Sequence, residues 1–356
     1  MFLYIGCVLM LIFLYPFFFR FHENDIRWKK QSYAYEVIIA TALILLAGLR
    51  KNTIGLDSTV YSNIIYRNFS QISFERLQPQ LTFFNEPGYK MLNWILGYRF
   101  HAGYPVLFLI CAAVSIAPIA VLIHKHSDYP ELSWVIYLLF GFYTFTFSTM
   151  RQAFAMGITV LAFLCIPKKK PVRFFLLVLL AMMFHKTAII FLPMYWLRYL
   201  KISWGSIFLF LVIGIVIYIF KSPILAFLNE NASNYYAEQE TGGTFQFLFI
   251  MLILISTVVM QEQFREGNPI NSLVFFMIVS TAAIFWMLKV NPTLFRLYFY
   301  YYVYVILLIP NQIKAIKSQA VRWGFLAGYL FVGAYFFYTQ VLTADLKLII
   351  YYFFWQ

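Results

Sequence analysis

The stretch LLVLLAMMFHKTAIIFLPMYW, residues 176–196, is apolar on both sides of one polar pair, His185-Lys186. The apolar run around it, residues 172–200, is too long for a single membrane span of about 20 residues. Two adjacent ionisable groups are costly inside a bilayer and mark functional sites there. We therefore interpret the run as two short spans that meet at the pair, and the pair as part of a site.

The composition places the whole chain in the membrane. Of its 356 residues, 62% are hydrophobic and 12% are charged, more apolar side chain than a soluble domain of this length can bury. The net charge of +13 is scattered among loops, which favours contact with anionic lipid or phosphate over nucleic acid. Cys7, Cys111 and Cys165 lie in apolar segments without a CxxC pair, so we expect neither a disulfide framework nor a structural zinc site.

The spacing of apolar runs predicts an all-α polytopic protein. Runs of about spanning length fall at residues 2–19, 33–49, 104–123, 132–149, 152–166, 205–220, 244–260, 270–288, 295–310 and 323–342. With the split run at 172–200 they predict about 12 transmembrane helices. The first run lacks a basic leader and a cleavage site, so we expect it to be a retained span. We find no repeat or linker and predict a single transmembrane domain, residues 1–356.

Basic loops predict the orientation. Lys and Arg concentrate at residues 20–30, in PKKKPVR (167–173) and at 311–322, which places these loops in the cytoplasm. The outer face then carries two longer segments. Residues 221–243 read as a polar loop. Residues 50–100 contain NEPGYKMLNWILGY (85–98), which predicts a short re-entrant or interfacial helix with Asn85 as its N-cap and Pro87 in its first turn.

Charged and polar residues gather at the outer ends of the predicted spans. The set comprises Arg50, Asp57, Tyr61, Glu86, Arg151, His185, Lys186 and Arg296. Each alone also fits a simpler role: an arginine can anchor a span end, a histidine can pack by hydrogen bonding, Glu86 can cap its helix, and Asp57 can pair with Arg50. Their convergence on one face indicates a binding site.

The residue types in this set suit a lipid-linked diphosphate. Guanidinium groups bind phosphate oxygens through bidentate hydrogen bonds. Glycosyl transfer from such a donor requires cations that stabilise the departing diphosphate and a base that accepts the proton of the acceptor hydroxyl. The sequence has no DxD, Walker A, GxGxxG or GxSxG motif. This absence disfavours a nucleotide-sugar enzyme, an ATPase and a serine hydrolase.

Four segments in order resemble the EpsG/Wzy-like family of bacterial polysaccharide polymerases. They are LRKNTIGLDSTVY (49–61), NEPGYKMLNWIL (85–96), STMRQAFAMGI (148–158) and FHKTAIIFLP (184–193). The resemblance implies a GT-C-like glycosyltransferase in the bacterial inner membrane. Such enzymes join repeat units carried on undecaprenyl diphosphate at the periplasmic or outer face, and they act beside a flippase and a chain-length regulator. The product would be O-antigen of lipopolysaccharide, capsule or exopolysaccharide.

The resemblance also assigns roles to residues. The matched positions are Arg50, Gly55, Asp57, Tyr61, Glu86, Arg151, Gln152, His185, Lys186 and Thr187, while Arg296 is matched by position alone. The expected substrate-binding residues are Arg50, Tyr61, Arg151, Gln152, Lys186 and Arg296. His185 is the first candidate for the base, with Asp57 and Glu86 as alternatives. No metal or other cofactor is expected.

Three other functions share parts of this pattern. A transporter or flippase of lipid-linked oligosaccharide would need a polar path across the bilayer, but the cytoplasmic halves of the spans are apolar. An acyltransferase would need a cytoplasmic acyl donor, whereas the loop charges place His185 outside. An O-antigen-ligase-type transferase would have the same site chemistry, and the sequence leaves it open.

Overall fold

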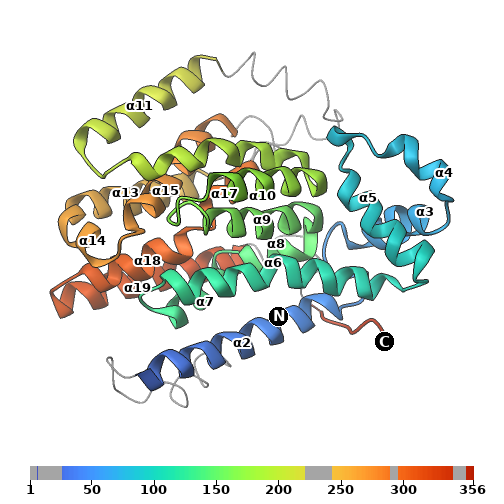
Figure 1. Ribbon diagram of the computed structural model, residues 1–356. Coiled ribbons are helices and arrows are strands. Elements are labelled where there is room, and N and C mark those ends of the chain that lie inside the picture. The colour runs from blue at the N-terminus through green and yellow to red at the C-terminus, as the bar shows by residue number, and fades with distance from the viewer. Residues whose placement is uncertain (1–5, 7–25, 221–242, 289–295, 340–349) are drawn as a thin grey trace. The chain divides into compact units, whose positions relative to one another are not determined.

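The computed structural model describes residues 6, 26–220, 243–288, 296–339 and 350–356 (Figure 1). The predicted span at 2–19 and the predicted loop at 221–243 fall almost entirely outside these residues. The chain groups into two compact units, one of Met1–Leu192 with Gly324–Gln356 and one of Pro193–Trp323. The single transmembrane domain stays a prediction.

The first unit is helical throughout its described core. Its elements are α2 (Ile26–Gly48), η1 (Val60–Tyr66), α3 (Arg67–Ser70), α4 (Phe74–Leu77), η2 (Gln78–Gln80), η3 (Phe83–Asn85), α5 (Pro87–Trp94), η4 (Ile95–Arg99), α6 (Tyr104–His126), α7 (Pro130–Leu139), α8 (Phe142–Ser148), α9 (Met150–Phe163) and α10 (Pro171–Phe184). Two elements cross the boundary between the units, η5 (Lys186–Tyr199) and α19 (Gln319–Phe337).

The core of this unit is a row of long helices in which α6 packs against α2 and α9, and α9 against α10. Glycines allow the close crossings. A Cβ at Gly48 of α2 would lie 2.7 Å from the Cα of Leu109, and one at Gly157 of α9 would lie 2.0 Å from the carbonyl oxygen of Val114. Small residues let membrane helices approach to backbone contact, and dispersion then stabilises the pair.

We expect Gly157→Ala to destabilise the protein by about 1–3 kcal/mol, because the added methyl group meets backbone that cannot move aside as a side chain would. The thermal unfolding midpoint in detergent measures this effect. Gly328→Ala in α19 is the matched control, since a Cβ there meets nothing within 4 Å. Equal midpoints for the two variants would contradict the packing of α6 on α9.

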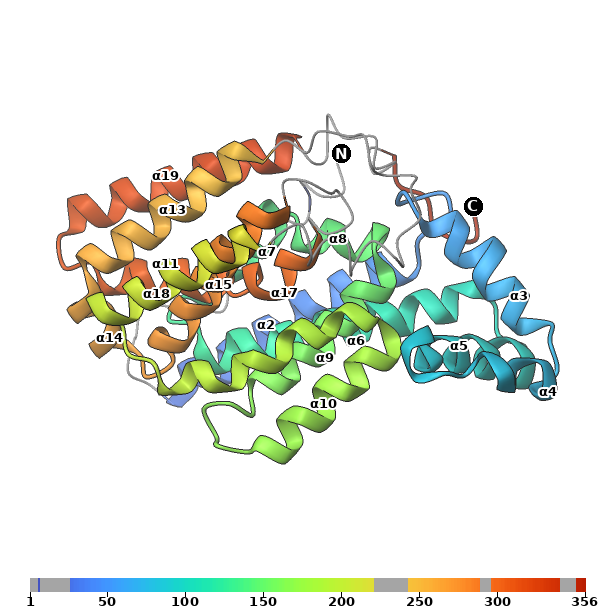
Figure 2. The same ribbon diagram turned by 90° about the horizontal axis from the view of Figure 1, so that it is seen from above.

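The outer segment is more helical than the sequence indicated. Where a loop and one short helix were predicted at 50–100, the structure has seven short elements, from η1 to η4. Figures 1 and 2 show α3, α4 and α5 gathered at the end of α6 where α6 begins. The predicted N-cap at Asn85 is wrong: Asn85 ends η3, and Glu86 occupies the cap position without a side-chain cap bond.

The apolar runs break where the backbone requires it. The predicted interruption at His185-Lys186 is confirmed, since α10 ends at Phe184 and η5 begins at Lys186. The predicted single span at 132–149 is wrong, because Gly141 has φ +83° and divides the run into α7 and α8. A left-handed residue cannot continue a right-handed helix, so the chain turns there.

The second unit is described by itself. Its elements are α11 (Trp204–Ile219), α13 (Thr244–Val259), α14 (Gln261–Gly267), α15 (Asn271–Leu288), η7 (Arg296–Tyr298), α17 (Phe299–Tyr302) and α18 (Val305–Ala315). Buried amides join its helices. Asn311 Nδ2 donates to Asn271 Oδ1 at 2.7 Å, and Gln312 Nε2 donates to Thr257 Oγ1 at 3.2 Å. Such side-chain bonds hold helices together where the surroundings are apolar.

The helices are those of a membrane protein, but about 12 spans are not confirmed. Among the described residues, α6 and α19 are long and apolar enough to cross a bilayer alone. The pair α13 and α14, bent by 85°, is a third candidate, and several further apolar helices have 10–17 residues. A helix of 14 residues such as α9 spans about 21 Å, less than the hydrocarbon core.

Candidate active site

Three charged side chains from distant parts of the chain meet at one end of the first unit. Glu86 precedes α5, Arg151 lies in the first turn of α9, and His185 follows α10. One carboxylate oxygen of Glu86 forms an ion pair with Arg151 Nη1, and the other lies 2.7 Å from His185 Nδ1. The side chains of Glu86, His185 and Arg151 are 12%, 20% and 35% exposed. We call these three residues the Glu86 cluster.

The backbone at Glu86 is held in an uncommon conformation. Glu86 has φ +53° and ψ +53°, in the left-handed region that residues with a Cβ rarely adopt. The following Pro87 begins α5, where its fixed φ suits a first helical turn. Gly88 brings α5 close to α10, since a Cβ there would lie 3.0 Å from Met183 Cβ. The turn thus directs the carboxylate toward the end of α10.

The cluster keeps Glu86 ionised. Burial by itself would raise the pKa of this carboxyl. The hydrogen bond from His185, the charges of Arg151 and His185, and the backbone N–H of Lys186 outweigh burial and lower the pKa to about 2. Glu86 is therefore a carboxylate that accepts hydrogen bonds at neutral pH, and it cannot readily take up a further proton.

We expect Glu86→Gln to destabilise the protein by about 1–3 kcal/mol near neutral pH, because Arg151 loses the partner of its charge in a partly buried site. The pKa of Glu86 lies below its ordinary value of 4.5, so its stabilisation is present above that value and is lost as pH falls toward 2. Denaturant unfolding in detergent between pH 3 and 7 measures the difference from wild type.

Glu75→Gln is the control for this substitution, since Glu75 lies exposed in α4. It should leave the unfolding free energy unchanged across the same pH range. A Glu86→Gln variant as stable as Glu75→Gln would show that the ion pair contributes nothing to the fold.

The carboxylate also fixes the tautomer of His185. With Glu86 ionised, the nitrogen 2.7 Å from it, Nδ1, is the one that carries the proton. In the neutral imidazole, Nε2 then has the free lone pair. A carboxylate in this position orients the ring and stabilises the imidazolium after proton uptake. The pair is thus arranged for general-base chemistry at Nε2.

Arg151 lies beside a contacting pair of tyrosine rings, whose centres are 6.2 Å apart. Its Cζ is 5.8 Å from the ring centre of Tyr61 and 5.9 Å from that of Tyr89, and it also forms a hydrogen bond with Tyr61. Its Nε has no hydrogen-bond partner within the described part of the chain. Aromatic faces favour a cation, and Glu86 occupies only one edge of the guanidinium. The Nε is buried, so a second anion can reach Arg151 only through the exposed part of its side chain, which is 35% exposed.

Other predicted residues lie around the cluster. Lys186 is exposed next to His185. Asp57 is half-buried in the turn before η1, where its carbonyl accepts a hydrogen bond from the Tyr61 amide at 3.0 Å. Gln152 is 4% exposed in α9. The structure thus brings Tyr61, Glu86, Arg151, His185 and Lys186 together, and direct substrate contact by Gln152 and Asp57 stays a prediction.

Two predicted arginines are not part of the cluster as described. Arg50 is 1% exposed, and its guanidinium is enclosed by protein groups, so the structure does not present it to a substrate. Arg296 begins η7 in the second unit, and its contribution to the site stays a prediction.

Tyr89 and Lys90 were not predicted from the sequence. Tyr89 is 2% exposed beside Arg151, and Lys90 lies one turn after Glu86 in α5. Burial lowers the pKa of Lys90, the Glu86 carboxylate opposes this shift, and the Arg151 charge adds to it. Their positions in the first turn of the helix that follows Glu86 were the signal that could have identified them.

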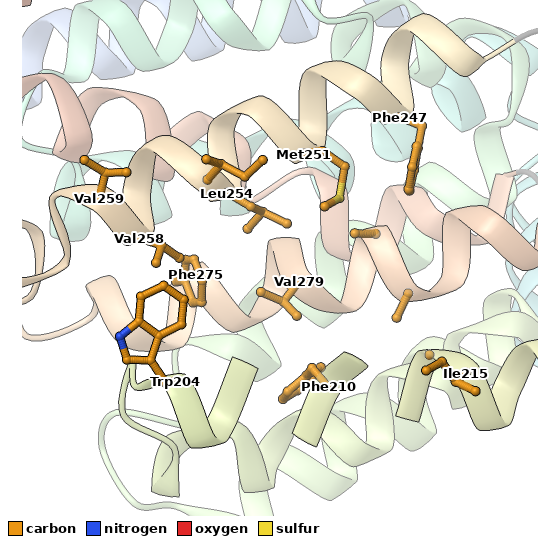
Figure 3. A pocket seen from close by; sticks show the side chains of 14 residues that line it. Trp204, Phe210, Ile215, Phe247, Met251, Leu254, Val258, Val259, Phe275 and Val279 are labelled. Atoms are coloured by element: carbon orange, nitrogen blue, oxygen red, sulfur yellow. The ribbon is translucent and has the colours of Figure 1, made fainter. Parts of the chain in front are cut away.

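The second unit contains an apolar groove of about 590 Å³ (Figure 3). Side chains of α11, α13 and α15 line it and point toward one another, among them Phe210, Ile215, Met251, Phe275 and Val279. Trp204 carries a polar atom at one end. Such a lining accepts hydrocarbon and offers little to a polar ligand.

Long apolar helices with a carboxylate–histidine pair and a guanidinium at the helix ends are the features of a membrane protein with a charged cluster. The comparison with known families agrees with this class. A family model matches residues 33–354, and the chain belongs to the EpsG family, a Wzy-like family of polysaccharide polymerases. No curated protein and no solved structure matches the chain. The GT-C-like arrangement stays a prediction.

Proposed function

We propose that the protein extends a polysaccharide by transferring the growing glycan from its undecaprenyl diphosphate carrier to a new lipid-linked repeat unit. The observation that carries this proposal is the Glu86 cluster, in which one carboxylate binds both an oriented histidine and a partly exposed arginine. Membership of a family of polysaccharide polymerases supports the reaction class. The site lies at the helix ends that the loop charges assign to the periplasmic or outer face of the bacterial inner membrane.

The reaction needs one proton transfer and one bond exchange. His185 Nε2 accepts the proton of the acceptor hydroxyl. At the same time, the oxygen of that hydroxyl attacks the anomeric carbon of the donor glycan. The bond from that carbon to the diphosphate breaks, and the bonding electrons leave with the undecaprenyl diphosphate. Arg151 and Lys186 stabilise the charge on this leaving group. The proton on His185 then passes to solvent, which restores the base.

We propose a different role for each of the three candidate bases. Glu86 accepts hydrogen bonds from Arg151, His185 and the Lys186 amide, so it acts through His185 as a positioning residue. With its Nδ1 on Glu86, His185 would accept the proton of the acceptor hydroxyl at Nε2. Asp57 lies in the neighbouring turn, where it suits contact with the sugar.

A lipid carrier also fits the second unit. The groove between α11, α13 and α15 is lined by aliphatic and aromatic side chains, which suit an isoprenoid chain. A flippase would supply the substrate to the outer face, and a chain-length regulator would limit the product.

Extension of a lipid-linked repeat unit by the purified protein in liposomes tests the proposal. We expect a ladder of lengthening products and release of undecaprenyl diphosphate, both without ATP. Glu86→Gln should slow the ladder without removing the protein from the liposome. Movement of the intact repeat unit between leaflets without extension would show a transporter. Transfer to a different acceptor without chain growth would show a ligase-type transferase.

A further inference from the structure

Arg50 is enclosed at the end of α2. Its Nε donates to the Ile54 carbonyl at 3.2 Å, its Nη1 to the Ala47 carbonyl, and its Nη2 to the Phe147 carbonyl at 3.1 Å and to Ser58 Oγ at 3.2 Å. The rings of two phenylalanines cover its faces, with centres 4.4 and 4.7 Å from Cζ. This guanidinium connects three segments of backbone, and with 1% exposure it leaves no surface for a ligand.

One of these contacts leads to the Glu86 cluster. The Phe147 carbonyl, in the last turn of α8, accepts hydrogen bonds from Arg50 and from Ser58 Oγ at 3.0 Å. The turn at Gly55 packs closely against the same carbonyl, since a Cβ on Gly55 would lie 2.4 Å from the Phe147 carbonyl oxygen. Arg151 follows four residues later, in the first turn of α9. The direction of Arg151 therefore depends on how the end of α8 is held.

The backbone of residues 351–356 pairs with the backbone on either side of Arg50. Arg50 and Phe353 form an antiparallel bridge. On either side of it, the Lys51 amide donates to the Tyr352 carbonyl and the Phe354 amide to the Leu49 carbonyl, each at 2.9 Å. The carbonyls at the end of a helix have no hydrogen-bond donors within the helix, and residues 351–356 supply such donors.

A fourth bond extends this contact back along α2. The Tyr351 hydroxyl donates to the Leu46 carbonyl at 2.6 Å. The Lys51 ammonium also lies 5.7 Å from the ring centre of Tyr352. Both backbone and side chains of residues 351–356 thus contact the last turn of α2 and the residues just after it, where Arg50 lies.

We propose that Arg50 and residues 351–356 form a clasp that positions Arg151, and that Arg50 does not bind the substrate. The clasp fixes the end of α2, Arg50 transmits this constraint to the Phe147 carbonyl, and α8 then sets the start of α9. Both arginines are needed for catalysis in this scheme, but of these two only Arg151 contacts the diphosphate. The proposal rests on the proposed polymerase function for its kinetic readout.

The experiment compares the full chain in nanodiscs with Arg50→Ala, Arg50→Lys and a variant truncated after Ile350. Extension of a lipid-linked repeat unit gives kcat and KM, and hydrogen exchange reports on residues 54–58 and 145–151. We expect a tenfold or greater loss of kcat in Arg50→Ala and in the truncated chain, with KM within twofold of wild type. Exchange at both segments should be faster by tenfold or more. Arg50→Lys should not restore kcat, because lysine lacks the fork that reaches several carbonyls.

Trp355→Ala is the control within the clasp. Its side chain is 61% exposed and stacks on Phe353, so its removal leaves the backbone bonds to α2 in place and should change neither readout. An increase in KM for Arg50→Ala alone, with a normal truncated chain, would overturn the proposal in favour of direct substrate binding. Unchanged hydrogen exchange in the truncated chain would also overturn it. If wild type extends no glycan, the polymerase proposal fails, while hydrogen exchange still decides whether the clasp exists.

Discussion

Replacing His185 with asparagine is expected to reduce the rate of glycan extension by about 10²–10⁴-fold, the usual contribution of a general base. Asparagine keeps a donor for the Glu86 carboxylate, so the ion pair with Arg151 survives and the fold is little changed. What is lost is the ring nitrogen that accepts the proton of the acceptor hydroxyl. The length distribution of polysaccharide in cells and the initial rate in liposomes both measure the loss.

The matched control is His101→Asn, on the same outer segment. His101 is exposed and has φ +50°, a conformation that asparagine adopts readily. This variant should produce a normal ladder at a normal rate. If His185→Asn also makes long chains at the wild-type rate while present in the membrane in equal amount, His185 is not the base, and Asp57 becomes the next residue to test.

Replacing Arg151 with alanine is expected to reduce kcat by about 10²–10³-fold, the typical effect of removing one donor from a site that stabilises developing charge. The loss should be larger in kcat than in KM, since the diphosphate gains charge as the glycosidic bond breaks. Arg151→Lys should retain part of the rate, because it keeps a cation but loses the planar fork. Steady-state kinetics with a lipid-linked repeat unit measures the effect.

Two comparisons make this result specific. Arg99→Ala removes an exposed arginine from the same outer segment and should leave kcat unchanged. Glu86→Gln, Arg151→Ala and the double variant form a cycle in which the two losses should not add, because the residues contact each other. Fully additive losses in kcat would indicate that Arg151 and Glu86 serve separate steps.

The main break in the chain and most of the cluster were visible in the sequence because they are costly in an apolar environment. An ionisable pair such as His185-Lys186 cannot lie in the middle of a span, which predicted the end of α10. Gly141 carries no such signal. The apolar run at 132–149 is long enough for one span, so the sequence did not reveal the turn between α7 and α8. The helical content of residues 50–100 was underestimated for a related reason, since these helices have only three to eight residues, too few to show a clear apolar periodicity.

The roles of the charged residues could be assigned only from the distances between residues that are far apart in the sequence. Glu86 and His185 are 99 residues apart, and their contact separates an orienting carboxylate from a base. Arg50 donates to a carbonyl 97 residues away, and a buried arginine bonded to backbone has the same sequence signal as one that binds phosphate. Position at a span end identifies the group, but contacts decide what the group does.

The division of the chain into units has a consequence for biogenesis. Residues 324–356 belong to the first unit, yet the ribosome makes them only after Pro193–Trp323 has been synthesised. At about 5–20 residues per second, the end of α2 waits about 15–60 seconds for residues 351–356. During that interval Arg50 has no bridging partner at Phe353, so in a nascent chain the proposed clasp would form only once residues 351–356 have been synthesised.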